Sequence, residues 1–532
     1  MVSFLVSVFP MKIKRYLYLT HRWFGVAMCL LFAMWFFSGM VMIYVGFPQL
    51  SQTEKFSSLP TLDISRVKYA VTDLLADLPD SSKIDTLKLT TVAGRPIYLL
   101  RTTNASWFGR YADTSERLTE VSKAVAKLSA KQFVLENNNY NSTHDMHYQA
   151  LLEIDQWSVS SSLNDHRPLH LINLNDVGST QLYISSVTGE VVRDTSGLER
   201  IWNWMGANLH WIYPFQLRRH TSLWVDVVVV LSLLGLVSVI SGAVIGLIRM
   251  RVRKPYRGNT YTPYKGVMKY HHLLGLWLLI FLTTYMFSGL MSMNPWNIFS
   301  EKSDSSAQIQ RYQQGGEVAS QNLAFEKSSE LVQLLNLYNG EAIKEITWHR
   351  LGGRSYVVLH SSELNRDVVM PNDPVAKQDI EAQVRSVIPL LIPTSDIGSI
   401  DVLEKYDAYY YSHHGALRSL PALRVKFLDD SSTWFHIDLN TGQVVNRLTT
   451  KGRAQRWLYN GLHSFDFNFL IQNRPLWDML VLTLCVPGLF FSLTAVVIAF
   501  KRSRRSLRIN VSHAVRSKIQ PSASQSTAPK RS

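Results

Sequence analysis

The sequence predicts an α-helical membrane protein with four transmembrane helices in a duplicated, two-half arrangement, together with two α+β domains outside the bilayer. Three observations predict this fold class. The chain of 532 residues contains four long apolar runs, its basic residues gather beside the ends of those runs, and its second half repeats the first at a nearly constant offset.

Each apolar run is near the roughly 20 residues that cross a bilayer core as a helix. We expect transmembrane helices at residues 23–47, 223–248, 273–293 and 476–500. The first ten residues, MVSFLVSVFP, are apolar but lack the basic start and the small-residue cleavage site of a secretory signal. The first run is therefore predicted to be a retained anchor.

Positive charge gathers in three short segments, residues 1–20, 249–272 and 501–532. Together they hold 19 Lys and Arg and no Asp or Glu, so the remainder of this chain of net charge +15 carries −4. The positive-inside rule predicts that both termini and the middle loop are cytoplasmic. Topology explains the basic pI, and nucleic-acid binding is not needed to explain it.

This topology divides the rest of the chain. Residues 1–22 form a cytoplasmic N-terminus, residues 249–272 a basic cytoplasmic loop, and residues 501–532 a basic tail that is predicted to be disordered. Residues 48–220 and 294–475 lie outside, and each segment is long enough for a small domain. Neither has a disulfide framework, because the two cysteines of the chain lie in the first and last apolar runs.

The two outer segments repeat the same local patterns. VKYAVTDLLADLP has helical periodicity and precedes TLKLTTVAGRPIYLLRT, which predicts two strands around a turn; SSELVQLLNLYN and KEITWHRLGGRSYVVLHS repeat that order. Later, STQLYISSVTGEVVRD and SSTWFHIDLNTGQVVNR both predict a strand, a Thr-Gly turn and a strand. Repeated α+β modules explain these matches.

The repeat also passes through the membrane segments, first at an offset of 250 without a gap and later at an offset of 253. At an offset of 250, His21, Gly25, Ser38 and Gly39 recur as His271, Gly275, Ser288 and Gly289. At an offset of 253, Arg200, Trp204, Leu209, His210, Leu223 and Trp224 recur as Arg453, Trp457, Leu462, His463, Leu476 and Trp477.

Two histidine pairs, His21 with His271 and His210 with His463, are thus repeated at membrane boundaries. For any one of them, the alternative is an ordinary hydrogen-bonded residue at the interface. We favour ligation, because each repeated residue is histidine and the neighbouring Gly and Ser leave room for a planar group between helices. His272, next to His271, is an alternative ligand that the repeat disfavours.

The surroundings of these histidines favour haem over other metals. A zinc or copper site usually brings carboxylates or thiolates, which are scarce in the apolar runs. A b-type haem requires two imidazoles across an apolar slot and polar groups where its propionates emerge, a position that Arg22 beside His21 suits. Histidine at all four positions predicts two haem b groups.

Membrane thickness decides which histidines can share an iron. A bilayer core is about 30 Å thick, whereas two axial nitrogens lie about 4 Å apart when each metal–nitrogen bond is about 2 Å. Pairing within one half would have to span the membrane. We therefore expect His21 to pair with His271 on the inner side, and His210 with His463 on the outer side.

The motif YLTHRWFG…FFSG, its echo KYHHLLGL…MFSG, the Thr-Gly hairpins and the two LH segments before an LW helix resemble the PepSY-associated transmembrane family, also called PiuB-like or iron-regulated membrane proteins. The resemblance covers nearly everything from Arg15 to Arg505. It implies PepSY-like periplasmic domains and a bacterial inner-membrane location. Members include haem-containing ferric-siderophore reductases.

The resemblance implies a membrane-bound reductase that passes electrons outward to a ferric siderophore or other Fe(III) chelate and contributes to iron acquisition. The cytoplasmic segments are too short for a nicotinamide or flavin domain, so electrons are expected from quinol or from a separate cytoplasmic reductase. Two alternatives remain open: a PepSY-type regulatory protein that binds a peptide or peptidase without redox activity, and a permease. The sequence also leaves open a metal-binding role for His144, His147, His413 and His414.

Overall fold

The structure is a computed structural model. It describes residues 10–76, 78, 84–103, 107–137, 146–301, 305–315, 323–338, 341–371, 380–412 and 417–519. The chain forms two compact units. The membrane unit contains the residues up to 43, residues 225–293 and the residues from 473, and the outer unit contains residues 44–224 and 294–472.

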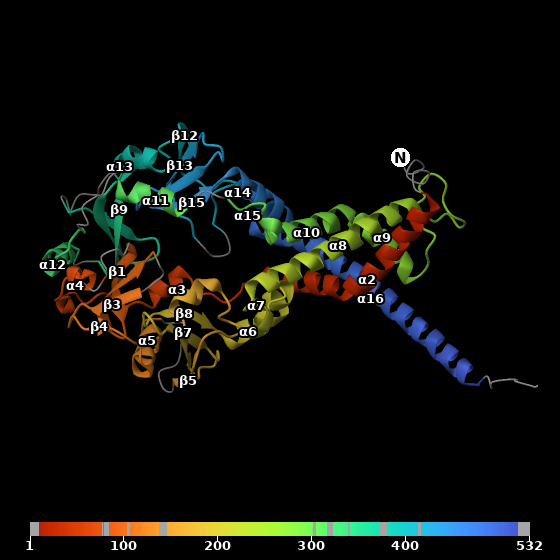
Figure 1. Cartoon of the computed structure of the whole chain (residues 1–532), viewed down its shortest axis with the longest axis horizontal. Coiled ribbons are helices and arrows are strands. Elements are labelled where there is room, and N and C mark those ends of the chain that lie inside the picture. The colour runs from red at the N-terminus through yellow and green to blue at the C-terminus, as the bar shows by residue number, and fades with distance from the viewer. Residues whose placement is uncertain are drawn as a thin grey trace, which may run out of the picture. The chain divides into compact units, whose positions relative to one another are not determined.

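Long helices build the membrane unit (Figure 1). They are α2 (Met11–Met42), α8 (Thr221–Arg249), α9 (Val267–Trp277), α10 (Leu279–Ser292) and α16 (Arg474–Ile519). Of these, α2, α8 and α16 are long and apolar enough to cross a bilayer, and α9 with α10 is a fourth candidate span if the bent pair is counted as one. Three or four candidate spans make this a multi-pass membrane protein.

The helices differ from the predicted spans in three places. Helix α2 begins at Met11, twelve residues before the predicted start, because the Lys and Arg residues there are good helix formers. The predicted helix 273–293 is instead the pair α9 and α10, which meet at 69° around Leu278. Helix α16 continues to Ile519 through a segment predicted to be disordered, because residues 501–519 contain no Gly or Pro.

The largest sheet of the outer unit takes strands from both outer segments, and its order is β11-β10-β9-β1-β2-β3-β4. The strands are β1 (Ile84–Val92), β2 (Arg95–Thr102), β3 (Trp107–Tyr111), β4 (Arg117–Leu118), β9 (Glu345–Leu351), β10 (Arg354–His360) and β11 (Arg366–Val369). Strand β1 pairs antiparallel with β9, so that Leu87 faces Trp348. The sequence predicts the two hairpins in separate domains, but they share one sheet, because pairing β1 with β9 removes an exposed edge from each hairpin.

The core of this sheet also joins the two segments. Helices α4 (Val71–Leu75) and α12 (Ser328–Leu337) contribute Leu74 and Leu334 to one buried cluster with β1 and β9. Both helices and both hairpins form where the local patterns predict them. The shared core therefore buries the apolar side of both predicted modules.

Two further sheets have four strands each, in the sequential orders β5-β6-β7-β8 and β12-β13-β14-β15. The strands are β5 (His147–Leu152), β6 (Leu169–Asn173), β7 (Gln181–Ser185), β8 (Val191–Thr195), β12 (Ile397–Leu403), β13 (Ala422–Phe427), β14 (Trp434–Asp438) and β15 (Val444–Leu448). Both predicted Thr-Gly hairpins are confirmed as β7–β8 and β14–β15. Their turns place Gly189 and Gly442 at φ +75° and +73°, which glycine adopts without strain.

Helices complete the outer unit. They are α3 (Gln52–Ser57), α5 (Lys123–Glu136), α6 (Gly197–Asn203), α7 (Phe215–Arg218), α11 (Ser305–Gln314), α13 (Ile380–Val387), α14 (Thr450–Gln455) and α15 (Asn468–Ile471). Two π-helical segments, η3 (Trp204–Asn208) and η6 (Arg456–Gly461), directly follow α6 and α14. These two segments lead into His210 and His463.

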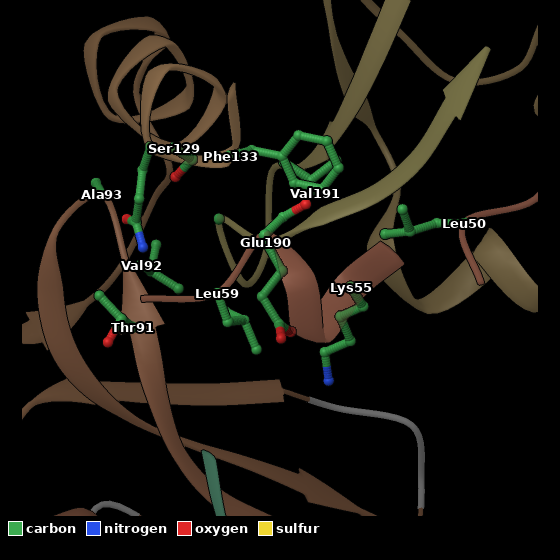
Figure 2. Close-up of a pocket in the computed structure, with 13 residues that line it drawn as sticks. Leu50, Lys55, Leu59, Thr91, Val92, Ala93, Ser129, Phe133, Glu190 and Val191 are labelled. Carbon is green, nitrogen blue, oxygen red and sulfur yellow. The ribbon is translucent and has the colours of Figure 1, made fainter. Parts of the chain in front are cut away.

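A buried ion-pair network ties the two outer segments together. Lys88 of β1 lies 2.5 Å from Glu190 and 3.4 Å from Glu345 of β9, and Lys55 lies 3.0 Å from Glu345. Burial favours the neutral carboxyl, but the two ammonium groups prevail and lower the pKa of Glu345 to about 2. Figure 2 shows Lys55 and Glu190 beside a cavity of about 40 Å³, which has room for little more than water.

Candidate cofactor site: two histidine pairs

The membrane unit brings the first predicted pair together. His21 lies on α2 and His271 on α9, and their ring centroids are 6.4 Å apart with an angle of 35° between the rings. Helix α16 packs against both α2 and α9. Two histidines that are 250 positions apart in the sequence therefore face each other inside one helix bundle.

A second helix holds each of these imidazoles through Nδ1. His21 Nδ1 lies 3.0 Å from the carbonyl oxygen of Ser238 on α8, and an oxygen of this kind only accepts, so Nδ1 carries the hydrogen. His271 Nδ1 lies 3.0 Å from Oγ1 of Thr494 on α16. Because the Thr494 hydroxyl donates to the Phe491 carbonyl at 2.5 Å, Oγ1 accepts from His271. In this tautomer Nε2 of each ring has a lone pair for a metal.

His272 is engaged at both ring nitrogens. Its Nε2 donates to the Gly246 carbonyl at 2.9 Å, and its Nδ1 lies 2.7 Å from the Thr262 hydroxyl. The side chain is also buried. His272 therefore braces α9 against α8 and the loop that joins them, whereas the ring of its neighbour His271 faces His21.

Glycines determine the space around the membrane pair. A Cβ atom added at Gly242 of α8 would lie 2.5 Å from Cε1 of His21, so only glycine allows this approach. An added Cβ at Gly25, one turn after His21, meets nothing within 4 Å. At Gly275 the corresponding space is filled by Phe491, whose ring stacks on His271 at 4.6 Å. Space is therefore open at Gly25 and filled at Gly275.

The outer unit brings the second predicted pair together. The ring centroids of His210 and His463 are 6.1 Å apart, with an angle of 63° between the rings. Both side chains are half-buried. This pair joins the end of the first outer segment to the end of the second.

The two π-helical segments set the direction in which these histidines point. Segment η3 ends two residues before His210, and η6 ends two residues before His463. A π-turn inserts an extra residue into a helix and so changes the direction of the side chains that follow. Gly206 permits the irregular backbone of η3, with φ −96° and ψ −105°. Sequence periodicity did not predict either segment, although glycines in WMGANLH and YNGLH mark both places.

Polar and aromatic contacts fix the outer pair in place. Gln156 donates to Oδ1 of Asn208 at 2.6 Å and to the Tyr213 carbonyl at 2.7 Å, which ties η3 to the chain that follows His210. On the other side, the Tyr459 ring lies 5.7 Å from the His463 ring. These contacts lie on both sides of the pair.

The remaining predicted residues are exposed or lie outside the described residues. Arg22 is exposed on α2, and His147 is exposed at the start of β5. His144, His413 and His414 lie outside the described residues. Among the residues that the structure does describe, no group of three or more His, Cys, Asp or Glu is arranged to hold a metal ion.

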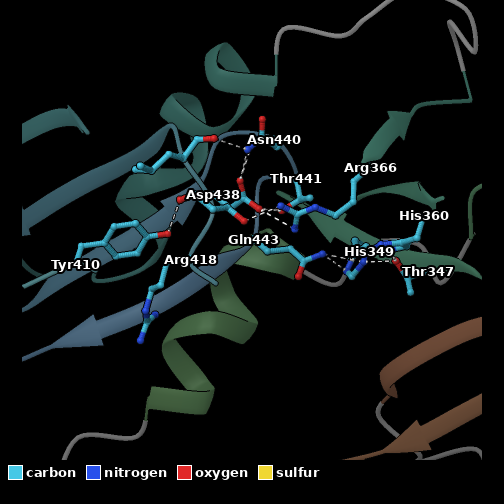
Figure 3. A network of polar contacts seen from close by, with 12 residues as sticks. Thr347, His349, His360, Arg366, Tyr410, Arg418, Asp438, Asn440, Thr441 and Gln443 are labelled. Carbon is cyan, nitrogen blue, oxygen red and sulfur yellow. Dashed lines mark hydrogen bonds and ion pairs between the residues drawn. The ribbon is translucent and has the colours of Figure 1, made fainter. Parts of the chain in front are cut away.

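Two half-buried histidines outside these pairs have a structural role. His349 and His360 in the seven-stranded sheet both contact Oγ1 of Thr347, at 2.8 and 2.9 Å, and Gln443 donates to His349 (Figure 3). Burial lowers the pKa of His349 to about 3 and that of His360 to about 4. These imidazoles therefore remain neutral members of a hydrogen-bond network at physiological pH.

Comparison with known proteins places the chain in a family. The family model described as PepSY-associated TM region matches residues 18–327, more than half of the sequence. The chain belongs to the PepSY-associated transmembrane family. The matched region of this PepSY-associated protein contains His21, His210 and His271, and His463 follows it. No curated protein matches the chain.

Proposed function

We propose that this PepSY-associated protein is a b-type dihaem protein of the bacterial inner membrane that passes electrons outward to a periplasmic ferric siderophore or other Fe(III) chelate, and so contributes to iron acquisition. His21 and His271 would hold one haem b, and His210 and His463 the other. The observation that carries the proposal is that both pairs of repeated histidines have the ring separation that bis-imidazole ligation requires.

The geometry supports haem at both pairs. A metal–imidazole nitrogen bond is about 2 Å long, and the ring centre lies about 1 Å beyond the nitrogen, so two axial imidazoles have centroids about 6 Å apart. The observed separations are 6.4 Å and 6.1 Å. The Nε2 lone pairs of His21 and His271 and the open space at Gly25 also suit a planar group. Imidazole without nearby carboxylate or thiolate favours haem iron over zinc.

The protein's own residues would fix the ligand directions. Ser238 and Thr494 hold Nδ1 of His21 and His271, which orients each ring and raises the basicity of its other nitrogen. At the outer pair, Gln156 and the π-helical segments would orient the histidine rings. Haem held by these histidines would supply one-electron transfer. Arg22, exposed beside His21, remains the proposed partner of a propionate.

The substrate reaction needs no acid or base from the protein. One electron converts Fe(III) in the chelate to Fe(II), a softer ion that hard oxygen ligands hold less tightly. The iron is then released from its carrier. The electron would come from quinol or from a separate cytoplasmic reductase, because the cytoplasmic segments are too short for a nicotinamide domain.

We further propose that the chain is a duplication, with both termini cytoplasmic and the outer unit periplasmic. Contacts repeated at an offset of 253 support the duplication. Asp176 accepts from Thr180 as Asp429 accepts from Thr433. His21 contacts Ser238, and His271 contacts Phe491, which stands 253 residues after Ser238. The basic segments support the orientation.

The test is spectroscopic. The full chain is expressed with added haem precursor and purified in detergent, and its haem content is measured from reduced-minus-oxidised spectra. We expect two haem b groups per chain, and we expect a ferric siderophore added to the anaerobically reduced protein to restore the oxidised spectrum. The same siderophore loaded with gallium, which is not reduced, is the control. A wild-type protein without haem would overturn the proposal and leave the regulatory or permease function.

A further inference from the structure

An apolar patch covers the outward side of α6 and the turn before β7. It contains Leu198, Ile201 and Trp202, which are 66, 58 and 42% exposed. Val177, Trp204 and Met205 are exposed as well and complete this α6 patch. A hollow of about 950 Å³, lined by residues that include Trp157 and Arg200, lies among them. Apolar side chains clustered on a surface in this way mark a site that binds a protein or a membrane.

The second half of the chain keeps only part of this patch. At an offset of 253, Trp204 and Met205 correspond to Trp457 and Leu458, but Val177, Leu198, Ile201 and Trp202 correspond to Asp430, Lys451, Ala454 and Gln455. Helix α14 has the same place after its sheet as α6 has after the first sheet. The fold therefore does not require an apolar surface here, and its presence on α6 needs another explanation.

A row of aromatic rings within the outer unit leads from the α6 patch to Trp224, the last residue of this unit before the rest of α8. Trp224 stands in the first turn of α8, and its ring lies 5.3 Å from that of Tyr213, which lies 5.7 Å from that of Phe47. The Phe47 ring lies 6.4 Å from Trp157, and Trp157 lies 6.2 Å from Trp204. The row is continuous from the beginning of α8 to the patch.

The chemistry of this row is that of a membrane interface. Trp and Tyr gather at the headgroup level of a bilayer, where the ring is buried and its polar atom stays wet. Arg218 stands 4.8 Å from the centre of the Trp224 ring, and a guanidinium beside interfacial aromatic rings is a typical partner of lipid phosphates. The carboxyl group of α6, Glu199, has its pKa raised to about 7 by burial, so its charge opposes an apolar contact less than that of an ordinary glutamate.

We propose that the α6 patch docks on the bilayer, with Leu198, Ile201 and Trp202 at the boundary between headgroups and acyl chains, and that the corresponding surface of α14 stays in water. The occupant is lipid, because ring contacts lead from the patch to Trp224 in the first turn of α8, a helix apolar and long enough to cross a bilayer. Docking would hold the chain before His210 at a fixed depth. The inference rests on the membrane spans and does not depend on haem.

Site-directed spin labelling tests the docking. Leu198→Cys and the matched control Lys451→Cys are each labelled in the full chain, whose two native cysteines are buried. The protein is reconstituted into vesicles of phosphatidylethanolamine and phosphatidylglycerol. Power saturation then compares collisions of the label with oxygen, which concentrates in lipid, and with a water-soluble nickel chelate.

We expect the label at residue 198 to collide mainly with oxygen and the label at residue 451 mainly with the nickel chelate. Equal access of both labels to nickel would overturn the proposal. A label at residue 198 shielded from both reagents would also overturn it, because a protein surface or a second copy of the chain would then cover the patch. Ile201→Cys repeats the measurement if Leu198→Cys does not fold.

Discussion

The two histidine pairs reach nearly the same separation by different means. In the membrane unit, His21 and His271 stand on regular helices, and neighbouring helices hold their Nδ1 atoms. In the outer unit, His210 and His463 follow π-helical segments. Helix packing therefore supports the first pair, and an irregular local backbone supports the second. Haem binding at the two pairs should respond to different substitutions.

The largest expected effect is the loss of one haem from one pair while the other pair keeps its haem. His21→Ala or His271→Ala should remove one of the two haems and leave the other, and His210→Ala or His463→Ala should do the reverse, because one imidazole does not replace two. Haem stoichiometry and low-temperature spectra of the four variants provide the measurement. His272→Ala is the matched control and should keep both haems. Loss of both haems from any single variant would contradict independent sites.

Gly242→Leu should abolish haem binding at the membrane pair and leave haem binding at the outer pair unchanged. Its Cβ would stand 2.5 Å from Cε1 of His21, and overpacking of this kind costs about 1–3 kcal/mol or moves the ring. Haem spectra should then resemble those of His21→Ala. Gly246→Ala, one turn later on α8, is the control, since its Cβ meets the flexible end of Leu276. An unchanged haem spectrum for Gly242→Leu would contradict the conclusion that glycine at position 242 makes room for the His21 ring.

Acid should weaken the outer unit through histidines that belong to neither pair. Burial lowers the pKa of His349 and of His436 to about 3, so the unfolded chain binds more protons than the folded chain below pH 6.5. Stability should fall as the pH falls from 6.5 towards 4, by up to about 1.4 kcal/mol per pH unit for each residue.

Thermal unfolding of the full chain at pH 7.5 and pH 5 measures this effect. His349→Gln should reduce the dependence on pH, whereas His147→Gln, at an exposed position, should not. The same scans show whether any acid-induced loss of haem from the outer pair accompanies unfolding. A stability independent of pH over this range would contradict the buried, neutral state of these histidines.

Gln156→Leu should affect only the outer pair. The change removes the hydrogen bonds to Asn208 and Tyr213 that tie η3 to the following chain, at a cost of about 1–3 kcal/mol for the polar groups left unpaired. We expect roughly tenfold weaker haem retention at the outer pair, measured by transfer to apomyoglobin. Gln149→Leu, at an exposed position, is the control. Selective loss of haem from the membrane pair would contradict the role of Gln156 at the outer pair.

The smallest effect is expected from Thr494→Val. Valine has nearly the same shape but cannot accept the Nδ1 hydrogen of His271, so the ring loses its orientation and some basicity. The midpoint potential of the membrane haem should shift while both haems remain bound. Redox titration of Thr494→Val, with Thr494→Ser as the conservative control, measures the shift. A shift confined to the outer haem would contradict the assignment.

Much of the local structure could be predicted from the sequence. Apolar runs indicate α8 and α16, and the strand patterns with their Thr-Gly turns indicate β7–β8 and β14–β15. The offsets of 250 and 253 also select, among 16 histidines, the four that the structure brings together in two pairs. These features depend on periodicity and repetition, which near neighbours in the chain already express.

Only the tertiary structure decided how these pieces combine. It pairs β1 with β9 in one sheet, bends the chain between α9 and α10, and presents the Ser238 carbonyl to His21. A backbone carbonyl leaves no trace in residue type, and strand pairing between distant segments depends on which edges and apolar faces meet after folding. Local sequence patterns therefore predict most helices and strands and the four histidines, whereas long-range packing sets their partners.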